Sequence, residues 1–269
     1  MDGVRTSGST QTMPVDSSNT FYFDHPLDHI PGIMLLTEML QAVRVTHEAA
    51  KGPLTAGRTR LDVQFPVMCE SGTDVVLECV PDEVSSSWEV TARQSDITVS
   101  EARVTFTTEA GTGLDATAPR VNASLVHRQR VENVLLGPPR ETAEASVVSH
   151  LVSPPPGHPL LANSPSVRSE EELIEAARQF CTLLSHHYQG EREDAQILWL
   201  SCTADLPRDL PREQPVSISW TPTTSRLRTV RYDLKLTDPV TDTEYGRIVN
   251  VSRCIDPATY RRLRSSQAG

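Results

Sequence analysis

The stretch FDHPLDHIPGIMLLTEMLQ, residues 23–41, joins a polar loop to an apolar run with helical spacing. Two histidines and two aspartates lie within six residues, and a Pro-Gly pair separates them from apolar side chains that begin at Ile33. The apolar period continues to Ala50, so it predicts a helix over residues 32–50 that the following GPLTAG stops. The loop in front of this helix contains the side-chain types that build a proton relay, a metal site or a helix cap.

Four segments with alternating apolar and polar residues follow the helix, separated by turn-forming residues. They cover residues 61–69, 74–80, 87–94 and 97–108. The second half repeats this order, with two strand-like segments, a proline-rich loop, a helix and four strands. These elements cover residues 131–137, 145–152, 151–166, 169–187, 197–206, 215–223, 226–238 and 244–255. A long helix followed by four strands, twice over, predicts a duplicated α+β chain whose two curved antiparallel sheets each wrap a helix and join as an internal pseudo-dimer.

The second helix has a clear start in the sequence. Ser169 is an expected N-cap, Glu172 lies at the capping-box position, and acidic residues fill the first turn. We divide the chain by composition into a flexible N-terminal arm, a first repeat, a linker, a second repeat and a tail. Their expected bounds are 1–19, 20–108, 109–124, 125–264 and 265–269.

Composition limits the classes of partner. The chain has 269 residues, 38% of them hydrophobic, which suits globular units with apolar cores. Its net charge of −10 argues against nucleic acid or an anionic membrane surface as the main partner, because both require a basic surface. The five cysteines have no CxxC or metal-ligand spacing, so we expect buried thiols in a reducing compartment. Without a signal peptide or an apolar run of about 20 residues, we place the protein in the cytoplasm.

The motif of residues 24–41 resembles the signature DHxxDHxPGMxLxEAxRQ of the A-factor biosynthesis hotdog (AfsA-like) family, whose members carry two hotdog repeats. VHRQRVENVLL (126–136), LIEAARQ (173–179) and IDPATYRRLR (255–264) also resemble motifs of that family. The half with the His-Asp motif comes first here and second in the family pattern, so the two repeats have a swapped order. The resemblance implies a double hotdog fold in which one helix and one curved sheet form each repeat.

The same resemblance implies an acyltransferase of secondary metabolism. Such enzymes join a β-ketoacyl chain from acyl carrier protein, or from a CoA thioester, to a hydroxylated or phosphorylated acceptor such as dihydroxyacetone phosphate, in γ-butyrolactone or butenolide synthesis. Related hotdog enzymes dehydrate or hydrolyse acyl thioesters in polyketide pathways, and this is the alternative function. A non-catalytic acyl-binding protein is the third. No cofactor is implied.

Superposing the two helix motifs without gaps aligns Thr37 with Glu175 and Leu40 with Arg178. The second helix therefore keeps an acid and a guanidinium on one face, whereas the first helix has lost both. If the active site lies at the junction of the two units, as it does in hotdog enzymes, the DHPLDHIPG loop faces Glu175 and Arg178. The reciprocal combination of Thr37 and Leu40 with the loop around His158 is then expected to be inactive.

Roles follow for the residues of the intact site. Glu175 is the expected general base, and Arg178 would hold a phosphate or carboxylate by a two-pronged hydrogen bond. His25 is the expected second proton-transfer group, with His29 next. The N–H groups near Gly32 would hold the oxyanion at the helix start.

The remaining binding residues support these. Asp24 and Asp28 would fix the histidine tautomers, and Gln179 is expected to contact substrate. In this interpretation the loop both caps the first helix and supplies half of the active site.

Other interpretations of the same residues remain open. The two aspartates could only cap the helix entry, or join the two histidines as metal ligands, although the spacing matches no zinc pattern. Glu175 and Arg178 could be an ordinary i,i+3 ion pair. An arginine cluster could dock an acidic carrier protein or be a solvated face. It comprises Arg226, Arg228, Arg231, Arg261, Arg262 and Arg264.

Overall fold

The computed structural model describes residues 8–25, 27–55, 57–82, 86–107, 119–161, 165–222 and 229–267. Its strands are β1 (Ser9–Met13), β2 (Arg58–Gln64), β3 (Val75–Asp82), β4 (Ser87–Gln94), β5 (Ile97–Thr107), β6 (Arg140–Glu141), β7 (Val147–His150), β8 (Gln196–Pro207), β9 (Ser217–Trp220), β10 (Thr229–Thr237) and β11 (Glu244–Ile255). Its helices are α1 (Gly32–Lys51), α2 (Glu170–His187) and α3 (Pro257–Gln267), with short 3₁₀ turns η1 (Ala123–Val126), η2 (Val131–Asn133) and η3 (Pro159–Leu161).

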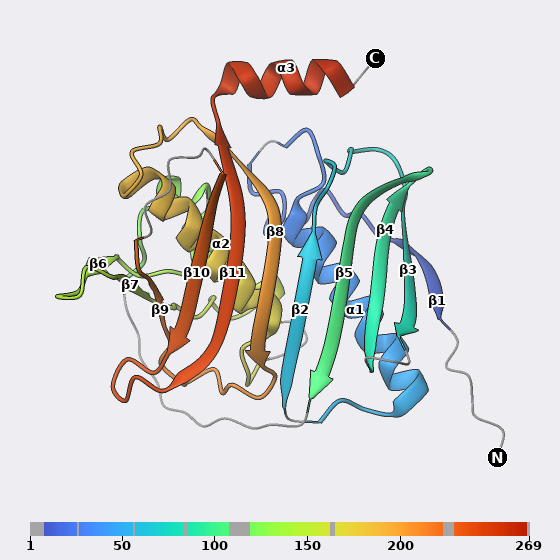
Figure 1. Cartoon of the computed structure of the whole chain (residues 1–269), viewed down its shortest axis with the longest axis horizontal. Helices are drawn as coiled ribbons and strands as arrows, with labels where there is room; N and C mark the ends of the chain where they lie inside the picture. Colours follow the sequence, from blue (N-terminus) through green and yellow to red (C-terminus); the bar gives the residue numbers. More distant parts are fainter. Residues whose placement is uncertain are drawn as a thin grey trace.

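All these strands form one antiparallel sheet in the order β1-β3-β4-β5-β2-β8-β11-β10-β9-β7-β6. The two halves of the chain meet where β2 pairs with β8, from Arg58 opposite Pro207 to Gln64 opposite Ser201. Figure 1 shows α1 and α2 behind the same face of this sheet, α1 across the first half and α2 across the second. This arrangement confirms the duplicated α+β architecture with one long helix and one curved sheet in each half.

Helix α1 packs into the core through apolar side chains. Its buried residues, apart from Thr46, are apolar, as the 3.6-residue period predicts. The helix ends before Gly52, whose φ of 88° is readily adopted only by glycine. Its N-cap is Pro31, which makes no side-chain cap hydrogen bond. The expectation that the His-Asp loop caps this helix is therefore wrong, since both aspartates bond elsewhere.

Helix α2 buries several glutamate side chains, whereas none of the buried residues of α1 is charged. Ser169 caps it as expected, accepting a hydrogen bond from the Glu172 N–H. The Glu172 carboxylate pairs with Arg168 and Arg212, both at 2.6 Å. Three more glutamates of this helix are buried, namely Glu170, Glu171 and Glu175. Because an uncompensated buried charge is costly, each of these carboxylates depends on a partner from elsewhere in the chain.

Three segments differ from the sequence expectations. Residues 9–13, inside the expected flexible arm, form β1 because they pair with the edge of β3. Residues 131–137 form the turn η2 and a single bridge at Leu136 instead of a strand. Residues 257–267 form α3, where Asp256 accepts a hydrogen bond from the Thr259 N–H at 2.8 Å and so acts as an N-cap. Most of the expected linker, namely residues 109–118, lies outside the described residues.

The five cysteines are all buried and free, as the spacing predicted. No helix within the described ranges has the length and apolar character needed to cross a membrane.

Candidate active site

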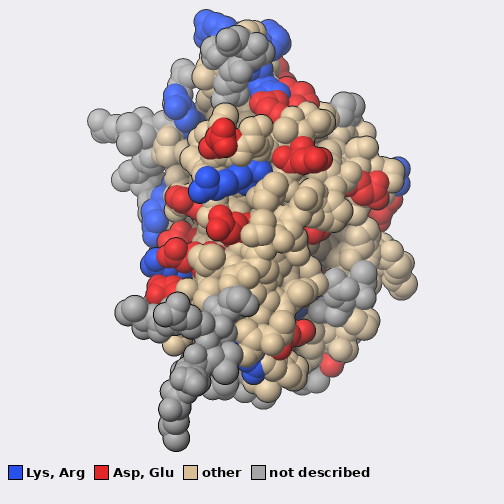
Figure 2. All heavy atoms as spheres, turned by 90° about the vertical axis from the view of Figure 1, so that its right-hand side faces the viewer, with Lys and Arg blue, Asp and Glu red and all other residues tan. Residues whose placement is uncertain are grey.

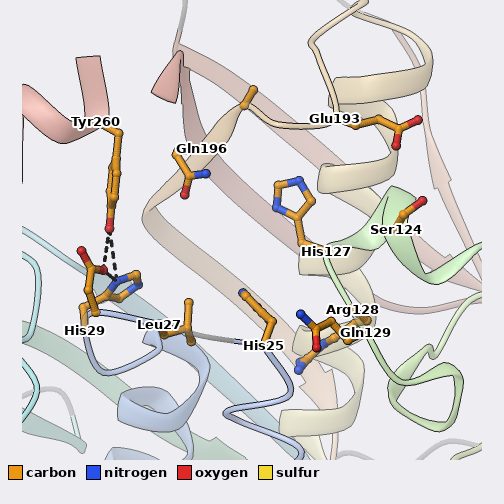
Figure 3. A pocket seen from close by; sticks show the side chains of 12 residues that line it. His25, Leu27, His29, Ser124, His127, Arg128, Gln129, Glu193, Gln196 and Tyr260 are labelled. Atoms are coloured by element: carbon orange, nitrogen blue, oxygen red, sulfur yellow. Dashed lines mark hydrogen bonds and ion pairs between the residues drawn. The ribbon is translucent and has the colours of Figure 1, made fainter. Parts of the chain in front are cut away.

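A pocket of about 640 Å³ opens where the two halves meet. Its wall comes from the His-Asp loop, the segment around η1, the loop before β8, and α3 (Figure 3). The lining residues are His25, Leu27, Asp28, His29, Ser124, His127, Arg128, Gln129, Glu193, Ala195, Gln196 and Tyr260. The pocket is thus a composite of both halves and holds three of the chain's histidines.

His25 and Asp24 form a hydrogen-bonded pair, with 2.8 Å between Nδ1 and Oδ1. Asp24 is buried and also faces the guanidinium of Arg128. Burial raises the pKa of Asp24, but the hydrogen bond from His25 and the charge of Arg128 bring this pKa below its usual value. The carboxylate is therefore ionised at neutral pH and accepts the Nδ1 proton of His25. The imidazole points into the pocket (Figure 3), where its Nε2 is left to accept or return a proton.

Arg128 links this pair to Glu175 of α2. Its Nη2 donates to Glu175 Oε1 at 2.6 Å, and its Nη1 lies 3.5 Å from Asp24 Oδ1. Its guanidinium also stacks over the ring of Phe21 at 4.8 Å from the ring centre. The two halves of the expected composite site are therefore brought together, with Arg128 between them.

Glu175 lies beneath the pocket and does not line it. Its side chain is 0% exposed and accepts from Arg128, from both Nε and Nη2 of Arg178, and from Gln179. Burial would raise the pKa of Glu175, but the charges of Arg128 and Arg178 lower it to about 2. A carboxylate so weakly basic and so fully bonded is poorly suited to the role of general base, and it acts in this geometry as the anchor of two arginines.

Arg178 and Gln179 are engaged with protein groups. Arg178 donates from Nε and Nη2 to the Glu175 carboxylate and does not line the pocket. Gln179 is 0% exposed, accepts from the Leu135 N–H and donates to the Asn133 carbonyl. The amide of Gln179 therefore crosslinks α2 to the segment at the end of η2, and Nε and Nη2 of Arg178 are engaged by Glu175.

A second His-Asp pair lies at the other end of the pocket. His29 Nδ1 donates to Asp28 Oδ1 at 2.8 Å, and Tyr260 donates its hydroxyl to the same oxygen at 2.8 Å. Arg264 pairs with Asp28 and with Glu70, so α3 is fastened to the loop. Burial raises the pKa of Asp28, but the bonds from His29 and Tyr260 and the charge of Arg264 lower it to about 2.

Gly32 does not line the pocket. A Cβ placed on it would lie 3.2 Å from Cε3 of Trp199 and 3.5 Å from the ring of Phe65. These two aromatic rings pack together with their centres 4.9 Å apart. The start of α1 therefore faces an aromatic pair, and the expectation that its N–H groups form an oxyanion site in the pocket is wrong for this cavity.

His127 is a pocket residue that the sequence reasoning missed. It ends η1 in the left-handed region, with φ of 52°, and its Nε2 lies 2.8 Å from Nε2 of His186. Burial, and then the nearby His186 and Arg178, lower the pKa of His127 to about 4. Tyr260 and Arg128 were missed as well. All three lie inside quoted motifs, VHRQRVENVLL and IDPATYRRLR, whose histidine, arginine and tyrosine could have marked them.

The reciprocal combination expected for the second site does not form. His158 lies in the buried network of the first site, with its Nε2 3.0 Å from Asn133 Oδ1 and its ring edge-on to Phe21. Thr37 donates its hydroxyl to the Ile33 carbonyl of its own helix, and Leu40 is buried in the core. The proline-rich loop therefore supports the intact site.

Metal ligation and an arginine cluster on the surface were two interpretations that the sequence left open. Within the described ranges, no cluster of three or more His, Cys, Asp and Glu residues has the geometry of a metal site. Arg261 and Arg262 are exposed on α3, whereas Arg264 is paired; Arg226 and Arg228 fall outside the described ranges. Cationic side chains lie at the top of the face in Figure 2, at the level of α3, above a body of mixed charge.

Comparison with known proteins gives the following matches. The A-factor biosynthesis hotdog domain matches residues 1–115 and 109–241. No curated protein sequence matches the chain.

Among solved structures, the dehydratase domain from the CurF module of curacin polyketide synthase has a TM-score of 0.61 at 9% identity, over 95% of this chain and 96% of that one. The dehydratase domain of RzxB from Pseudomonas fluorescens has a TM-score of 0.57 at 16% identity, over 83% and 84%. The tesB protein of Mycobacterium avium subs paratuberculosis has a TM-score of 0.56 at 14% identity, over 94% and 95%. At these identities the structures establish a shared double hotdog fold.

Proposed function

Since the chain belongs to the A-factor biosynthesis hotdog family, we propose that it is an acyltransferase acting on a β-ketoacyl thioester and a hydroxylated acceptor such as dihydroxyacetone phosphate, as in γ-butyrolactone or butenolide synthesis. The observation that carries this proposal is the His25–Asp24 pair, whose imidazole faces a pocket between the two halves. A histidine held by a buried carboxylate is the common means of removing a proton from an attacking hydroxyl.

The proposed step balances through His25. Its Nε2 takes the hydroxyl proton of the acceptor while the acceptor oxygen bonds to the thioester carbonyl carbon. The C–S bond then breaks, the acyl ester forms, and the departing thiolate receives the proton from the imidazolium. Asp24 stabilises the transient positive charge on the ring, and the amides of Gln129 and Gln196 present donors to the carbonyl in the same pocket.

The charges around the site indicate which groups of the acceptor it would recognise. Arg128 and Arg178 carry two positive charges that Asp24 and Glu175 balance at distances of 2.6 to 3.5 Å. We therefore assign Arg128 and Arg178 to positioning, and expect the acceptor to be recognised mainly through its hydroxyl groups. Two-pronged binding of a phosphate through Nε and Nη2 of Arg178 would require these groups to exchange Glu175 for the ligand.

A carrier protein is the proposed donor of the acyl chain. Arg261 and Arg262 are exposed on α3, a helix without acidic residues that reaches the pocket through Tyr260. An acidic carrier would be repelled by a net charge of −10 unless it met such a local basic surface. Docking there would bring a tethered thioester to the mouth of the pocket.

A dehydratase is the second candidate. In this reaction His25 would remove the α-proton of a β-hydroxyacyl thioester, and its imidazolium would return that proton to the β-hydroxyl, which leaves as water as the C–O bond breaks and the alkene forms. The observation that favours it is that Glu175 holds Nε and Nη2 of Arg178, the two-pronged edge that would otherwise bind a phosphorylated acceptor.

Mass spectrometry distinguishes these reactions. The protein is incubated with β-ketoacyl and β-hydroxyacyl carrier proteins, with dihydroxyacetone phosphate, dihydroxyacetone or no acceptor, beside a His25→Gln variant. An acyl ester formed by the wild type and not by H25Q supports the transferase. An alkene moves the assignment to dehydration, free acid moves it to thioester hydrolysis, and an unchanged thioester in every mixture contradicts both enzymatic proposals.

A further inference from the structure

A chain of hydrogen bonds runs from the proline-rich loop of the second half to His25 of the first. It begins at the Leu160 N–H, which donates to Nδ1 of His158 at 3.2 Å. Because a backbone N–H can only donate, Nδ1 of His158 is the unprotonated nitrogen and its proton lies on Nε2. That Nε2–H donates to Asn133 Oδ1 at 3.0 Å.

The direction of the Asn133 amide follows from this contact. With Oδ1 turned to His158, Nδ2 donates to the Thr20 carbonyl at 2.9 Å and to Asp24 Oδ2 at 3.2 Å. The opposite orientation would place an amide oxygen against a carboxylate and a carbonyl, with no donor for either. The contact with His158 therefore fixes the orientation of the Asn133 amide in which Nδ2 donates to Asp24.

The last hydrogen bond of the chain joins Asp24 to His25, which lines the pocket. Asp24 Oδ2 also accepts from the Gln129 N–H at 3.3 Å, while Oδ1 accepts from His25 Nδ1 at 2.8 Å and faces Arg128 at 3.5 Å. Every donor thus approaches a defined side of the carboxylate, which fixes its rotation. Asp24, Asn133 and His158 are all buried, so water does not replace a missing partner.

His158 is suited to a permanently neutral donor. Its ring packs edge-on against Phe21, and burial, followed by the charges of Arg128 and Arg120, lowers its pKa to about 4. It therefore adds a hydrogen bond to the network without adding a charge near Arg128.

We propose that Asn133 and His158 are positioning residues that orient Asp24 and thereby hold His25 in the Nδ1–H tautomer with Nε2 free toward the pocket. This inference rests on the proposed function for its kinetic consequence, but the tautomer of His25 is a property of the resting protein. Residues that orient a metal ligand from behind typically contribute 10- to 100-fold to activity, and we take this range for Asn133 and His158, which lie two and three contacts behind His25.

The test compares His158→Phe and Asn133→Ala with His158→Gln, whose amide keeps a donor near the position of Nε2. His150→Phe is the matched control, because His150 also lies in the second half and bonds a single hydroxyl, that of Ser217 at 3.0 Å, outside the pocket. Each variant is checked for folding by its melting temperature. Nitrogen-15 NMR of the imidazoles then reports the tautomer of His25, and carrier-free thioester turnover separates kcat from KM.

We expect H158F and N133A to give mixed His25 tautomers and kcat reduced about 10- to 100-fold at unchanged KM, with H158Q restored and H150F unaltered. A His25 that stays fully in the Nδ1–H form in folded H158F and N133A overturns the proposal. If the wild type turns over no thioester, the proposed function fails while the NMR result still decides this inference. A folded H158F with mixed tautomers and undiminished kcat overturns the kinetic part.

Discussion

Asp24 and Arg128 come from different halves of the chain and lie 3.5 Å apart, and the same guanidinium lies 2.6 Å from Glu175 on its other side. One cation therefore joins the His-Asp loop to helix α2. The site exists only when the two halves are docked, because neither half contains both carboxylates and the arginine.

Replacing Arg128 should destabilise the protein strongly. Arg128→Met leaves two buried carboxylates without their shared cation, so we expect the free energy of unfolding to fall by about 3 to 5 kcal/mol. Urea unfolding measures this. Arg103→Met is the control, because the Arg103–Glu89 pair is exposed on the sheet and its loss should cost at most about 1 kcal/mol. Equal losses of unfolding free energy in the two variants would contradict the role of Arg128 as the cation shared by two buried carboxylates.

The two histidines of the loop should differ in their effect on turnover. We expect His25→Gln to reduce kcat about 10²- to 10⁴-fold, the usual contribution of a proton-transfer group. His29→Gln should have a smaller effect, because His29 Nδ1 lies between Asp28 and Tyr260 at the far end of the pocket. The measurement is single-turnover kinetics with one thioester for both variants. A larger loss in H29Q would transfer the proposed role to the second pair.

Stability should fall in mild acid. Burial lowers the pKa of His127 and of His158 to about 4, from an ordinary value of about 6.5. Between these values the unfolded chain binds more protons than the folded one, so the free energy of unfolding decreases as the pH falls from 6.5 towards 4. Melting temperatures at pH 7.5 and pH 5 measure the decrease. A double His127→Gln, His158→Gln variant should show a flatter profile, and an unchanged wild-type melting temperature would contradict the assignment.

The basic surface of α3 should affect the carrier protein only. Charge reversal in Arg261→Glu, Arg262→Glu is expected to raise KM for a carrier-bound thioester about tenfold or more at low salt, and to leave a carrier-free thioester unaffected. Arg93→Glu, on the exposed side of β4, is the matched control. Equal effects on both substrates would point to damage of the pocket through Tyr260 instead.

Much of the fold could be predicted because burial imposes a period on the sequence. The apolar face of α1, the cap of α2 at Ser169, and the alternation in β4 and β11 all agree with the structure. The segment at residues 131–137 has the apolar content of a strand, but its backbone turns in η2 because its polar groups serve the site. Local composition does not contain that requirement.

The site was predictable only in outline. The resemblance implied that the His-Asp loop faces Glu175 and Arg178. In the structure Arg128 stands between Asp24 and Glu175, and its position depends on how the halves dock. The same holds for His158, whose partner Asn133 is close in space and not in sequence. The prediction for Gly32 failed for a related reason, since Phe65, just after β2, and Trp199, in β8, cover it from distant parts of the sequence.

Leu40 and Arg178 each stand ninth in their helix, and the contrast between α1 and α2 extends along their length. One copy of the helix is packed by apolar side chains, while the other holds a row of buried glutamates that each need a compensating partner. The two helices therefore differ in role, since α1 mainly packs the core and α2 mainly supports the site. In directed evolution, substitutions in the first helix should therefore change mainly stability, whereas substitutions in the second should change stability and activity together.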